Sequence, residues 1–544
     1  MQGWWIPGHE TPTSDPSQIA RAVQSIAEPI VLVDAGGYLA SASHGTCLIG
    51  SPPPDVPAYR LVALGGPVPL EMMGDLTFCA DHSVRYPYVT GAMANGIGSA
   101  DIVEAMGLSG MLGFFGSAGL SPERVEKEID RIQATLGNRS FGFNLISTPG
   151  EPEMEANIVD LYLRKGVRRI EASAFLALTL PLIRFRVRGI HRDNAGRIVT
   201  PNQVIGKVSR VEVATKFFSP PPEEFLQKLV QSGEITEDQA TLAQQIPVAQ
   251  DITAEADSGG HTDNRPALTM LPTMLALRDR LQTQYQYGQR LRVGLGGGIA
   301  TPASVAAAFA MGASYVVTGT VNQSCVESGT SDFVRGMLSQ AEQPDVAMAP
   351  AGDMFEMGVK VQVLKRGTLF AMRAQKLYDL YSAYKSIDEI PAADRAMIEK
   401  QCFRAPLEDV WKQTVEYFQR RDPRQVQRGE KDPKHQMALI FRWYLGQSSR
   451  WAINGEPTRQ ADYQVWCGPA MGAFNEWVKD SCLSATENRR VTAVAFNLLY
   501  GAAILQRVGE LQRQGVSLPA QATDVRPIPM DEILSRIQPA WASA

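Results

Sequence analysis

Between residues 85 and 320, short apolar segments alternate with helical patterns in a regular order. Eight segments are rich in apolar or β-branched side chains: YPYVTGAM, GMLGFFG, SFGFNLI, VRRIEASA, QVIGKVS, IPVAQDITAEA, LRVGLGGG and SYVVTGT. Helical patterns separate most of them, and short buried strands that alternate with helices predict a parallel sheet. Eight such units, ending near Thr320, predict an α/β fold of the (β/α)8 TIM barrel type. A doubly wound open sheet is the alternative.

The sequence on either side of these units has a different texture. Residues 1–80 hold short apolar segments separated by Gly and Pro, which predicts a small N-terminal α/β unit. We expect the barrel to cover residues 81–345, with a helical insertion near 216–246. Residues 346–544 carry helical periodicity and predict a C-terminal α-helical domain. This domain could pack on the barrel, cap its mouth, form an oligomer contact or serve only as a structural bundle.

The composition excludes several classes of protein. Apolar residues make up 44% and charged residues 20% of the chain, as in soluble globular proteins. The net charge of −5 argues against a nucleic-acid partner. The sequence contains no run of 18 apolar residues, so we expect no membrane span. The N-terminus lacks a signal-peptide pattern, so we expect a cytoplasmic location. The cysteines are scattered without a CxxC pair, which predicts reduced thiols. Because an HExxH motif is also missing, we expect no metal site. The large helical third suggests a homodimer.

The seventh and eighth predicted units end in glycines. LRVGLGGGIATPASVAAAFAMG predicts a strand, a glycine turn with Gly297 and Gly298, and a helix with Pro302 in its first turn. The eighth strand ends at Gly319 and Thr320. In TIM barrels these two loops often bind phosphate through backbone N–H groups. A Rossmann site is disfavoured because Ile299 replaces the last glycine of GxGxxG. A glycine turn without a ligand is the alternative.

The sixth predicted strand runs into EADSGGHTDNRPALTML, which contains His261. Barrel active sites lie at the carboxyl ends of the strands, and a histidine there can donate or accept a proton near neutral pH. We expect Asp257 or Asp263 to hold its tautomer, with a surface histidine in a polar turn as the alternative. Asn144 and Lys207 add polar groups at two further strand ends.

Several motifs, in their order along the chain, resemble the nitronate monooxygenase superfamily. They are GAMANG, FGFNLI, GKVSRVEVA, EADSGGH, GLGGGIA and VVTGT, within residues 85–325. Its members are FMN-bearing barrels and include flavin-dependent enoyl-ACP reductases. The segments GWWIPG, VNQSCVESGTSDFVRGML and APAGDMFEMGVKVQVLKRGTLFAMRAQKLYDLY are similar to the PfaD family. These proteins are trans-acting enoyl reductases of polyunsaturated fatty acid and polyketide synthases.

The resemblance implies roles for particular residues. His261 matches the histidine of the family's GGH motif, which acts as a base in nitronate oxidation and lies beside the substrate in enoyl reductases. Where the simpler enzymes usually have glycine, this chain has Asp263, so the proton-transfer role of His261 stays open. The implied FMN contacts are Gly91, Ala92 and Met93 near the isoalloxazine, Asn144 and Lys207 beside it, Ser258, Gly259 and Gly260 through their backbone, and Gly297, Gly298, Gly319 and Thr320 around the phosphate.

The implied reaction moves a hydride from NADPH through FMN to the β-carbon of a 2-enoyl thioester. His261 would donate a proton to the α-carbon or polarise the thioester carbonyl. The acyl chain would be held by acyl carrier protein domains of a separate synthase, and Arg184, Arg186 and Arg188 could meet an acidic carrier or form a solvated strand face. Two alternatives remain: a nitronate or other flavin oxidase, and a flavin-less scaffold subunit of the synthase. The choice between a fatty acid and a polyketide pathway stays open.

Overall fold

The computed structural model describes residues 3–9, 11–52, 54–148 and 151–537. Within these ranges the chain forms two compact units. One unit holds the chain up to Tyr88, Ala300–Val316 and the chain from Trp477 onward. The other holds Val89–Ile299 and Val317–Glu476. This grouping differs from the expected boundaries 1–80, 81–345 and 346–544, which stay a prediction.

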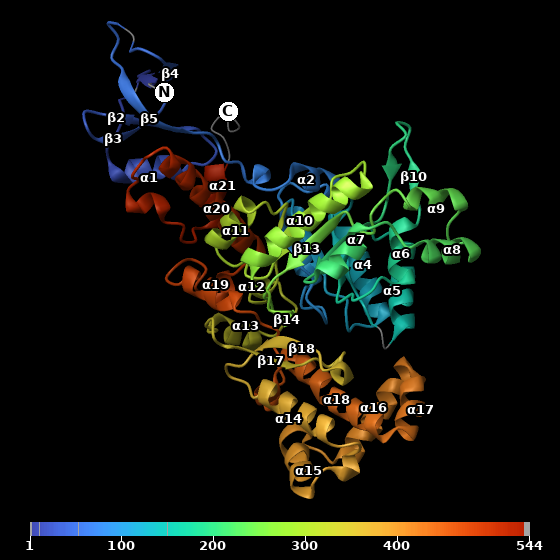
Figure 1. The fold of residues 1–544 in the computed structure, drawn as a ribbon. Helices are drawn as coiled ribbons and strands as arrows, with labels where there is room; N and C mark the ends of the chain where they lie inside the picture. The colour runs from blue at the N-terminus through green and yellow to red at the C-terminus, as the bar shows by residue number, and fades with distance from the viewer. Residues whose placement is uncertain (1–2, 10, 53, 149–150, 538–544) are drawn as a thin grey trace. The chain divides into compact units, whose positions relative to one another are not determined.

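A closed barrel of eight strands occupies the middle of the chain (Figure 1). Its closure confirms the predicted TIM barrel and rules out the open sheet. Nearly every residue of its strands is buried, which explains why they appear in the sequence as continuous apolar runs. In order around the barrel the strands are β6 (Tyr88–Thr90), β7 (Leu112–Phe115), β8 (Gly142–Ile146), β9 (Arg169–Ser173), β12 (Gln203–Val208), β13 (Asp251–Glu255), β15 (Arg292–Gly296) and β16 (Val316–Thr318).

Helices follow the strands and begin at recognisable caps. In the first turn of α4, for example, the Ser121 side chain accepts a hydrogen bond from the Arg124 N–H, and Pro122 starts the helix. Two helices, α8 and α9, fall within the insertion expected near residues 216–246. The helices of this region are α3 (Ala100–Leu108), α4 (Pro122–Leu136), α5 (Pro152–Lys165), α6 (Leu180–Val187), α7 (Val211–Phe218), α8 (Glu223–Gln231), α9 (Glu237–Ala243), α10 (Ala267–Tyr285), α11 (Pro302–Ala310) and α12 (Thr320–Gln323). A short hairpin, β10 (His191–Arg192) and β11 (Ile198–Val199), follows α6.

The arginine-rich segment RFRVRG forms the second half of α6 and the residues that end it. The interpretation of this segment as a solvated strand face is therefore wrong. Thr179 caps this helix and Pro181 lies in its first turn. Arg186 is fully buried and donates to the carbonyls of Pro247 and Asn202. Arg186 therefore cannot meet a carrier, and the expectation that all three arginines form a docking surface is wrong. The other two arginines pair with acidic side chains, among them Glu234.

The expected helical domain begins with strands. β17 (Val346–Pro350) and β18 (Lys360–Leu364) pair in antiparallel fashion, and β18 also pairs with β14 (Gly260–His261). The third strand of this sheet thus comes from the loop after β13 and carries the candidate catalytic histidine.

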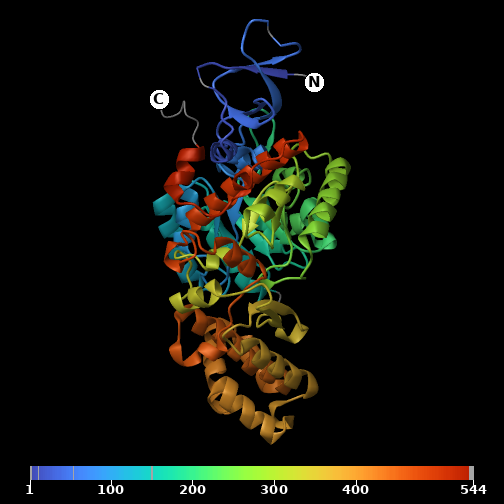
Figure 2. The same cartoon turned by 90° about the vertical axis from the view of Figure 1, so that its left-hand side faces the viewer.

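Beyond β18 the chain forms a bundle of helices, which lie side by side in both views (Figures 1 and 2). Its core includes Phe355, Phe370, Phe403 and Phe441. Its helices are α14 (Phe370–Ala383), α15 (Ala392–Ile398), α16 (Leu407–Arg421), α17 (Pro423–Lys431) and α18 (Pro433–Asn454), and α19 (Ala470–Val478) follows.

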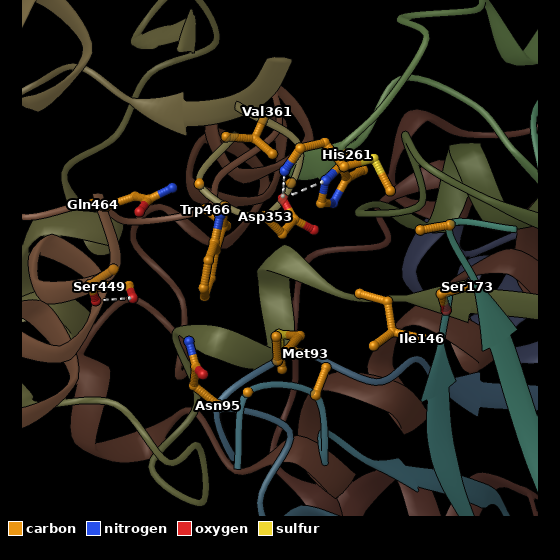
Figure 3. A pocket seen from close by; sticks show the side chains of 18 of the residues that line it. Met93, Asn95, Ile146, Ser173, His261, Asp353, Val361, Ser449, Gln464 and Trp466 are labelled. Atoms are coloured by element: carbon orange, nitrogen blue, oxygen red, sulfur yellow. Dashed lines mark hydrogen bonds and ion pairs between the residues drawn. The ribbon is translucent and has the colours of Figure 1, made fainter. Parts of the chain in front are cut away.

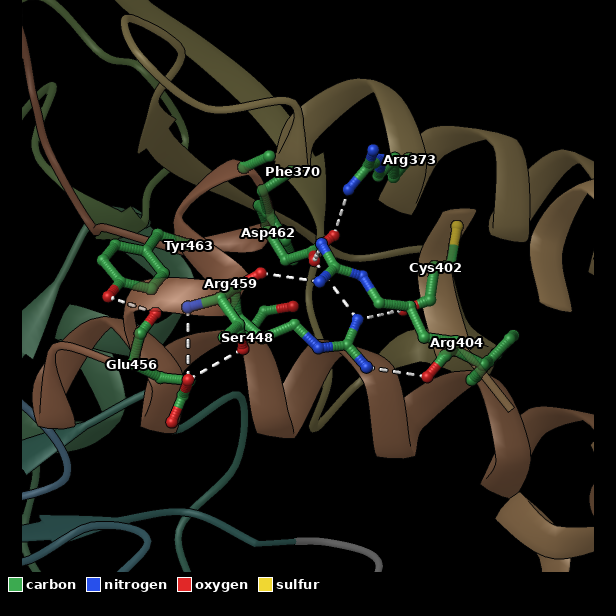
Figure 4. A network of polar contacts seen from close by, with 12 residues as sticks. Phe370, Arg373, Cys402, Arg404, Ser448, Glu456, Arg459, Asp462 and Tyr463 are labelled. Carbon is green, nitrogen blue, oxygen red and sulfur yellow. Dashed lines mark hydrogen bonds and ion pairs between the residues drawn. The ribbon is translucent and has the colours of Figure 1, made fainter. Parts of the chain in front are cut away.

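A buried carboxylate cross-links this bundle (Figure 4). Asp462 has no exposed surface and forms ion pairs with Arg373, Arg404 and Arg459. The Tyr444 hydroxyl donates a further hydrogen bond to it over 2.8 Å. The guanidinium groups come from three separate segments, so this one side chain ties them together.

The first unit combines the two ends of the chain. Its antiparallel sheet has the order β3-β2-β5-β1-β4, with β1 (Gly3–Ile6), β2 (Ile30–Asp34), β3 (Leu39–Ala42), β4 (Thr46–Ile49) and β5 (Tyr59–Gly65). Its helices are α1 (Pro16–Gln24), α2 (Leu76–His82), α20 (Val491–Arg513) and α21 (Met530–Ile537), together with α11. Arg507 of α20 is buried and donates to the carbonyls of Ser25, Ile26 and Glu28. Among the described residues, α20 alone has the length and hydropathy to cross a membrane, and 78% of its apolar 18-residue stretch is buried in the protein.

Candidate active site

One cavity of about 820 Å³ opens at the carboxyl ends of the barrel strands. This volume lies in the range of ordinary small-molecule sites. Every predicted site residue lines it, so the structure brings them all together: Gly91, Ala92, Met93, Asn144, Lys207, Ser258, Gly259, Gly260, His261, Gly297, Gly298, Gly319 and Thr320. Residues of the helical bundle, among them Trp443 and Arg442, line the same cavity.

The turn after β6 is fixed by hydrogen bonds from its neighbours. The Gly91 N–H donates to the Thr318 carbonyl over 2.9 Å, and the Ala92 N–H donates to Oε2 of Glu171 over 2.9 Å. A Cβ atom at Gly91 would lie 2.9 Å from Val317, so a larger residue would displace the turn. These contacts therefore fix the position in which Gly91 and Ala92 line the cavity.

Lys207 lies among carboxylates beside this turn. Its Nζ is 3.2 Å from Oε1 of Glu255. Burial alone would lower the pKa of Lys207, but the charges of Glu255 and Glu171 outweigh it and raise the pKa, so the side chain is a cation. Burial raises the pKa of Glu171, although Lys207 and the Ala92 N–H oppose the shift. Oε1 of Glu171 is buried without a hydrogen-bond partner among the described residues.

Asn144 has one side-chain atom left for a ligand. Its Nδ2 donates to the Glu171 carbonyl and to the Ser173 hydroxyl, each over 3.1 Å. These contacts fix the orientation of the amide, and within the described part of the chain nothing donates to Oδ1. The oxygen can therefore accept a hydrogen bond from an N–H group of a heterocyclic ligand bound in the cavity.

The glycine loops after β15 and β16 provide free donors. Gly297 and Gly298 have positive φ angles of 85° and 76°, which favour glycine. A Cβ at Gly297 would come within 2.6 Å of Ala256, whereas Cβ atoms at Gly298 and Gly319 would enter open space. No other described residue accepts a hydrogen bond from the N–H groups of Gly298 and Gly319. Unpaired N–H groups around open space are suited to a phosphate.

The segment Ser258–Gly260 is held from outside the barrel. The side chain of Gln362, on β18, donates to the Ser258 carbonyl over 2.9 Å and to Oδ1 of Asp257 over 2.8 Å. Gly259 lies so close to the Cys467–Gly468 backbone that its Cβ would come within 2.9 Å of the Cys467 nitrogen. The glycine is therefore needed for this close approach.

His261 faces Asp353, which sequence reasoning missed (Figure 3). Its Nε2 lies 3.2 Å from Oδ1 of Asp353. The expectation that Asp257 or Asp263 holds the histidine is wrong. Asp263 instead forms an ion pair with Arg210 over 2.9 Å, and Asp257 accepts from Gln362 and from Asn264. Both aspartates stabilise the loop without touching the imidazole.

The family model described as nitronate monooxygenase matches residues 77–374, more than half of the chain. The chain belongs to the nitronate monooxygenase family. This result confirms the predicted resemblance. A second model, described as the inserted helical domain of [acyl-carrier-protein] S-malonyltransferase, matches residues 384–463 in the helical bundle.

Individual relatives of this family member are described as proteins of macrolactin, fatty acid or polyketide biosynthesis. The crystal structure of the enoyl reductase domain of MlnA, from the macrolactin biosynthesis cluster of Bacillus amyloliquefaciens, is 38% identical with a TM-score of 0.77. The match covers 82% of this chain and 99% of that domain. A polyunsaturated fatty acid synthase subunit of Thraustochytrium is 48% identical over 82% of this chain. Polyketide biosynthesis protein PksE of Bacillus subtilis is 44% identical over 84%. The matches span only 30% and 58% of the lengths of those two relatives.

Three side chains of this family member's site were not singled out from its sequence. Asp353 lies in the quoted segment APAGDMFEMG, and Glu255 begins the quoted EADSGGH, so the resemblance contained a signal for both. Glu171 lies in the predicted strand VRRIEASA, where a carboxylate among apolar residues is itself a signal. The partners of Glu171 lie on β12 (Lys207) and in the turn after β6 (Ala92), so no local sequence pattern could show this arrangement.

Proposed function

We propose that the chain is an FMN-dependent, NADPH-using enoyl reductase that acts in trans on 2-enoyl chains carried by acyl carrier protein domains of a polyunsaturated fatty acid or polyketide synthase. The observation that carries the proposal is that His261 and the donors of Gly298 and Gly319 line a single cavity. A proton-transfer group and an anion cradle thus face the same space. The identity of 38% to an enoyl reductase domain supports this function over others in the family.

The residues present fit FMN. The unpaired N–H groups of Gly298 and Gly319 would bind its phosphate, Oδ1 of Asn144 would accept from a ring N–H, and Gly91–Met93 would lie against the ring. The Lys207 cation would favour negative charge on the bound group. When bound, the flavin supplies hydride transfer between NADPH and the β-carbon of the enoyl thioester.

The proton chemistry belongs to His261. Burial would lower its pKa, but the Asp353 carboxylate outweighs burial and raises it, so the imidazolium form persists to higher pH. A cationic imidazole can donate a proton to the α-carbon or a hydrogen bond to the thioester carbonyl. Asp353 also limits the directions in which the ring can turn.

A single anaerobic experiment tests the proposal. Purified protein with flavin absorbance is bleached by NADPH, and a 2-enoyl thioester then restores the absorbance. The His261→Ala variant keeps its FMN but loses most of the second phase. Full restoration in this variant would contradict the role of His261. Absence of flavin absorbance would favour the scaffold subunit.

A nitronate oxidase is the second candidate, because the family match itself favours it. It would consume oxygen with a small nitroalkane and would not need NADPH. Oxygen uptake with a nitroalkane and no response to the enoyl thioester would select it. A cytoplasmic location and a homodimer remain predictions.

A further inference from the structure

The loop Gly352–Met357 connects the candidate catalytic histidine to the helical bundle. It carries two carboxylates, Asp353 and Glu356, that contact different partners. Asp353 lies against His261, whereas Glu356 lies against His435 of α18. Both carboxylates and both histidines line the same cavity.

Two residues of α18 hold this loop. Nδ1 of His435 is 2.8 Å from Oε1 of Glu356. Arg442 donates from Nε to the Gly352 carbonyl over 2.8 Å, and its Nη1 lies 3.6 Å from Oε2 of Glu356. The loop is thus fixed on both sides of Asp353, at Gly352 and at Glu356.

The two residues of α18 are themselves well placed to act as anchors. The His435 side chain is only 2% exposed, and its Nε2 lies 3.0 Å from Oε1 of Gln425. Its backbone N–H donates to Asp432, which caps α18. Arg442 follows seven positions later, so both residues lie on one face of the helix.

Asp353 has few contacts of its own. Its side chain is 44% exposed, and its described partners are His261 and the adjacent Met354 N–H. The direction of its carboxylate is therefore set by the backbone of the loop. The contacts of the loop with α18 determine where that backbone lies.

We propose that His435 and Arg442 are positioning residues of the active site, which hold the loop Gly352–Met357 so that Asp353 faces His261. The helical bundle then takes part in catalysis, beyond serving as a structural bundle. The inference rests on the proposed role of His261. Its primary measurement, the pKa of His261, needs no turnover and is independent of the reaction catalysed.

A purely electrostatic role and a positioning role of Arg442 predict opposite changes in the pKa of His261 when Arg442 is replaced by Gln. The charged groups that influence His261 are Asp353, Glu255 and Lys207, and Arg442 influences Asp353. Removal of a nearby cation would by itself raise the pKa of His261. Loss of the Asp353 contact would lower the pKa, because Glu255 alone would then oppose the effect of burial. A fall in the pKa therefore indicates positioning.

The experiment titrates His261 by NMR in the flavin-bound protein with labelled histidines. The His261 signal is identified by its loss in the His261→Gln variant. We expect the pKa to fall in Arg442→Gln and in His435→Phe, and to stay unchanged in Arg420→Gln, an exposed arginine of α16 outside the cavity. We also expect kcat/KM for the enoyl thioester to fall by up to about 100-fold, as when a catalytic group is displaced. The alkaline limb of its pH profile should move to lower pH.

Two further variants make the inference falsifiable. In an Asp353→Asn background, Arg442→Gln should not lower the pKa of His261 further, because its positioning effect passes through Asp353. Arg442→Lys keeps a donor for the Gly352 carbonyl, so the pKa of His261 should fall less in this variant than in Arg442→Gln. An unchanged or raised pKa in Arg442→Gln, or an additional fall in the Asp353→Asn background, would overturn the proposal. If Arg442→Gln does not fold, His435→Phe decides in the same way. A protein without enoyl reductase activity but with these pKa shifts would refute the proposed function alone.

Discussion

Nε2 of His261 lies 3.2 Å from Oδ1 of Asp353, although 92 positions separate the two residues in the chain. The antiparallel pairing of β14 with β18, in which His261 is opposite Val361, brings the two segments together. The candidate site of the barrel therefore includes a side chain from the loop before β18, which follows the barrel in sequence.

Asp353→Asn should lower the pKa of His261, because burial then acts without the opposing carboxylate. If the imidazolium donates the proton, activity is present below this pKa and is lost above it. The alkaline limb of the kcat/KM profile should therefore move to lower pH, and activity at pH 8 should fall by at least about tenfold. The measurement is a pH series with NADPH and an enoyl thioester. Asp279→Asn, on the exposed face of α10, serves as the control, and an identical profile for both variants would refute the prediction.

Lys207→Met should weaken FMN binding by about tenfold or more, because it removes the half-buried cation and leaves two carboxylates beside the turn Gly91–Met93. Fluorescence titration of the apoprotein with FMN measures the effect. The control is Lys127→Met, in an exposed part of α4. Equal Kd values for the two variants would show that Lys207 does not act on the flavin.

The barrel could be predicted because its strands are buried on both faces and stand out as apolar runs. The glycine loops and His261 could be placed because every barrel strand ends on the same side. By contrast, β14 contains only Gly260 and His261, and its partner β18 lies about 100 positions away, so no local pattern could show the pairing. For this reason Asp257 and Asp263, close in sequence, were expected to hold His261 in place of Asp353.

Gly298→Ala should abolish or strongly weaken FMN binding, because the new Cβ enters the open space beside the unpaired N–H groups. Gly233→Ala is a matched control, since Gly233 has a φ of 72° against 76° at Gly298 and also faces open space, but does not line the cavity. Both variants should lose about 1–2 kcal/mol of stability from the left-handed backbone. The two effects separate in parallel thermal unfolding and FMN titrations. FMN binding by Gly298→Ala as tight as by Gly233→Ala would contradict the phosphate site.

Asp462→Asn should reduce the free energy of unfolding of the helical bundle by about 3–5 kcal/mol. The carboxylate is fully buried among Arg373, Arg404 and Arg459, and the neutral amide would leave these guanidinium groups without their counter-charge. The amide NH2 group would also face the arginine donors, so the hydrogen bonds cannot simply be kept. Urea unfolding followed by tryptophan fluorescence measures the change, because Trp443 and Trp451 pack on the bundle core. Asp388→Asn is the control, since Asp388 is 94% exposed and its ion pair with Arg395 spans 3.9 Å. A midpoint for Asp462→Asn as high as that of the control would show that the arginines are satisfied without the carboxylate.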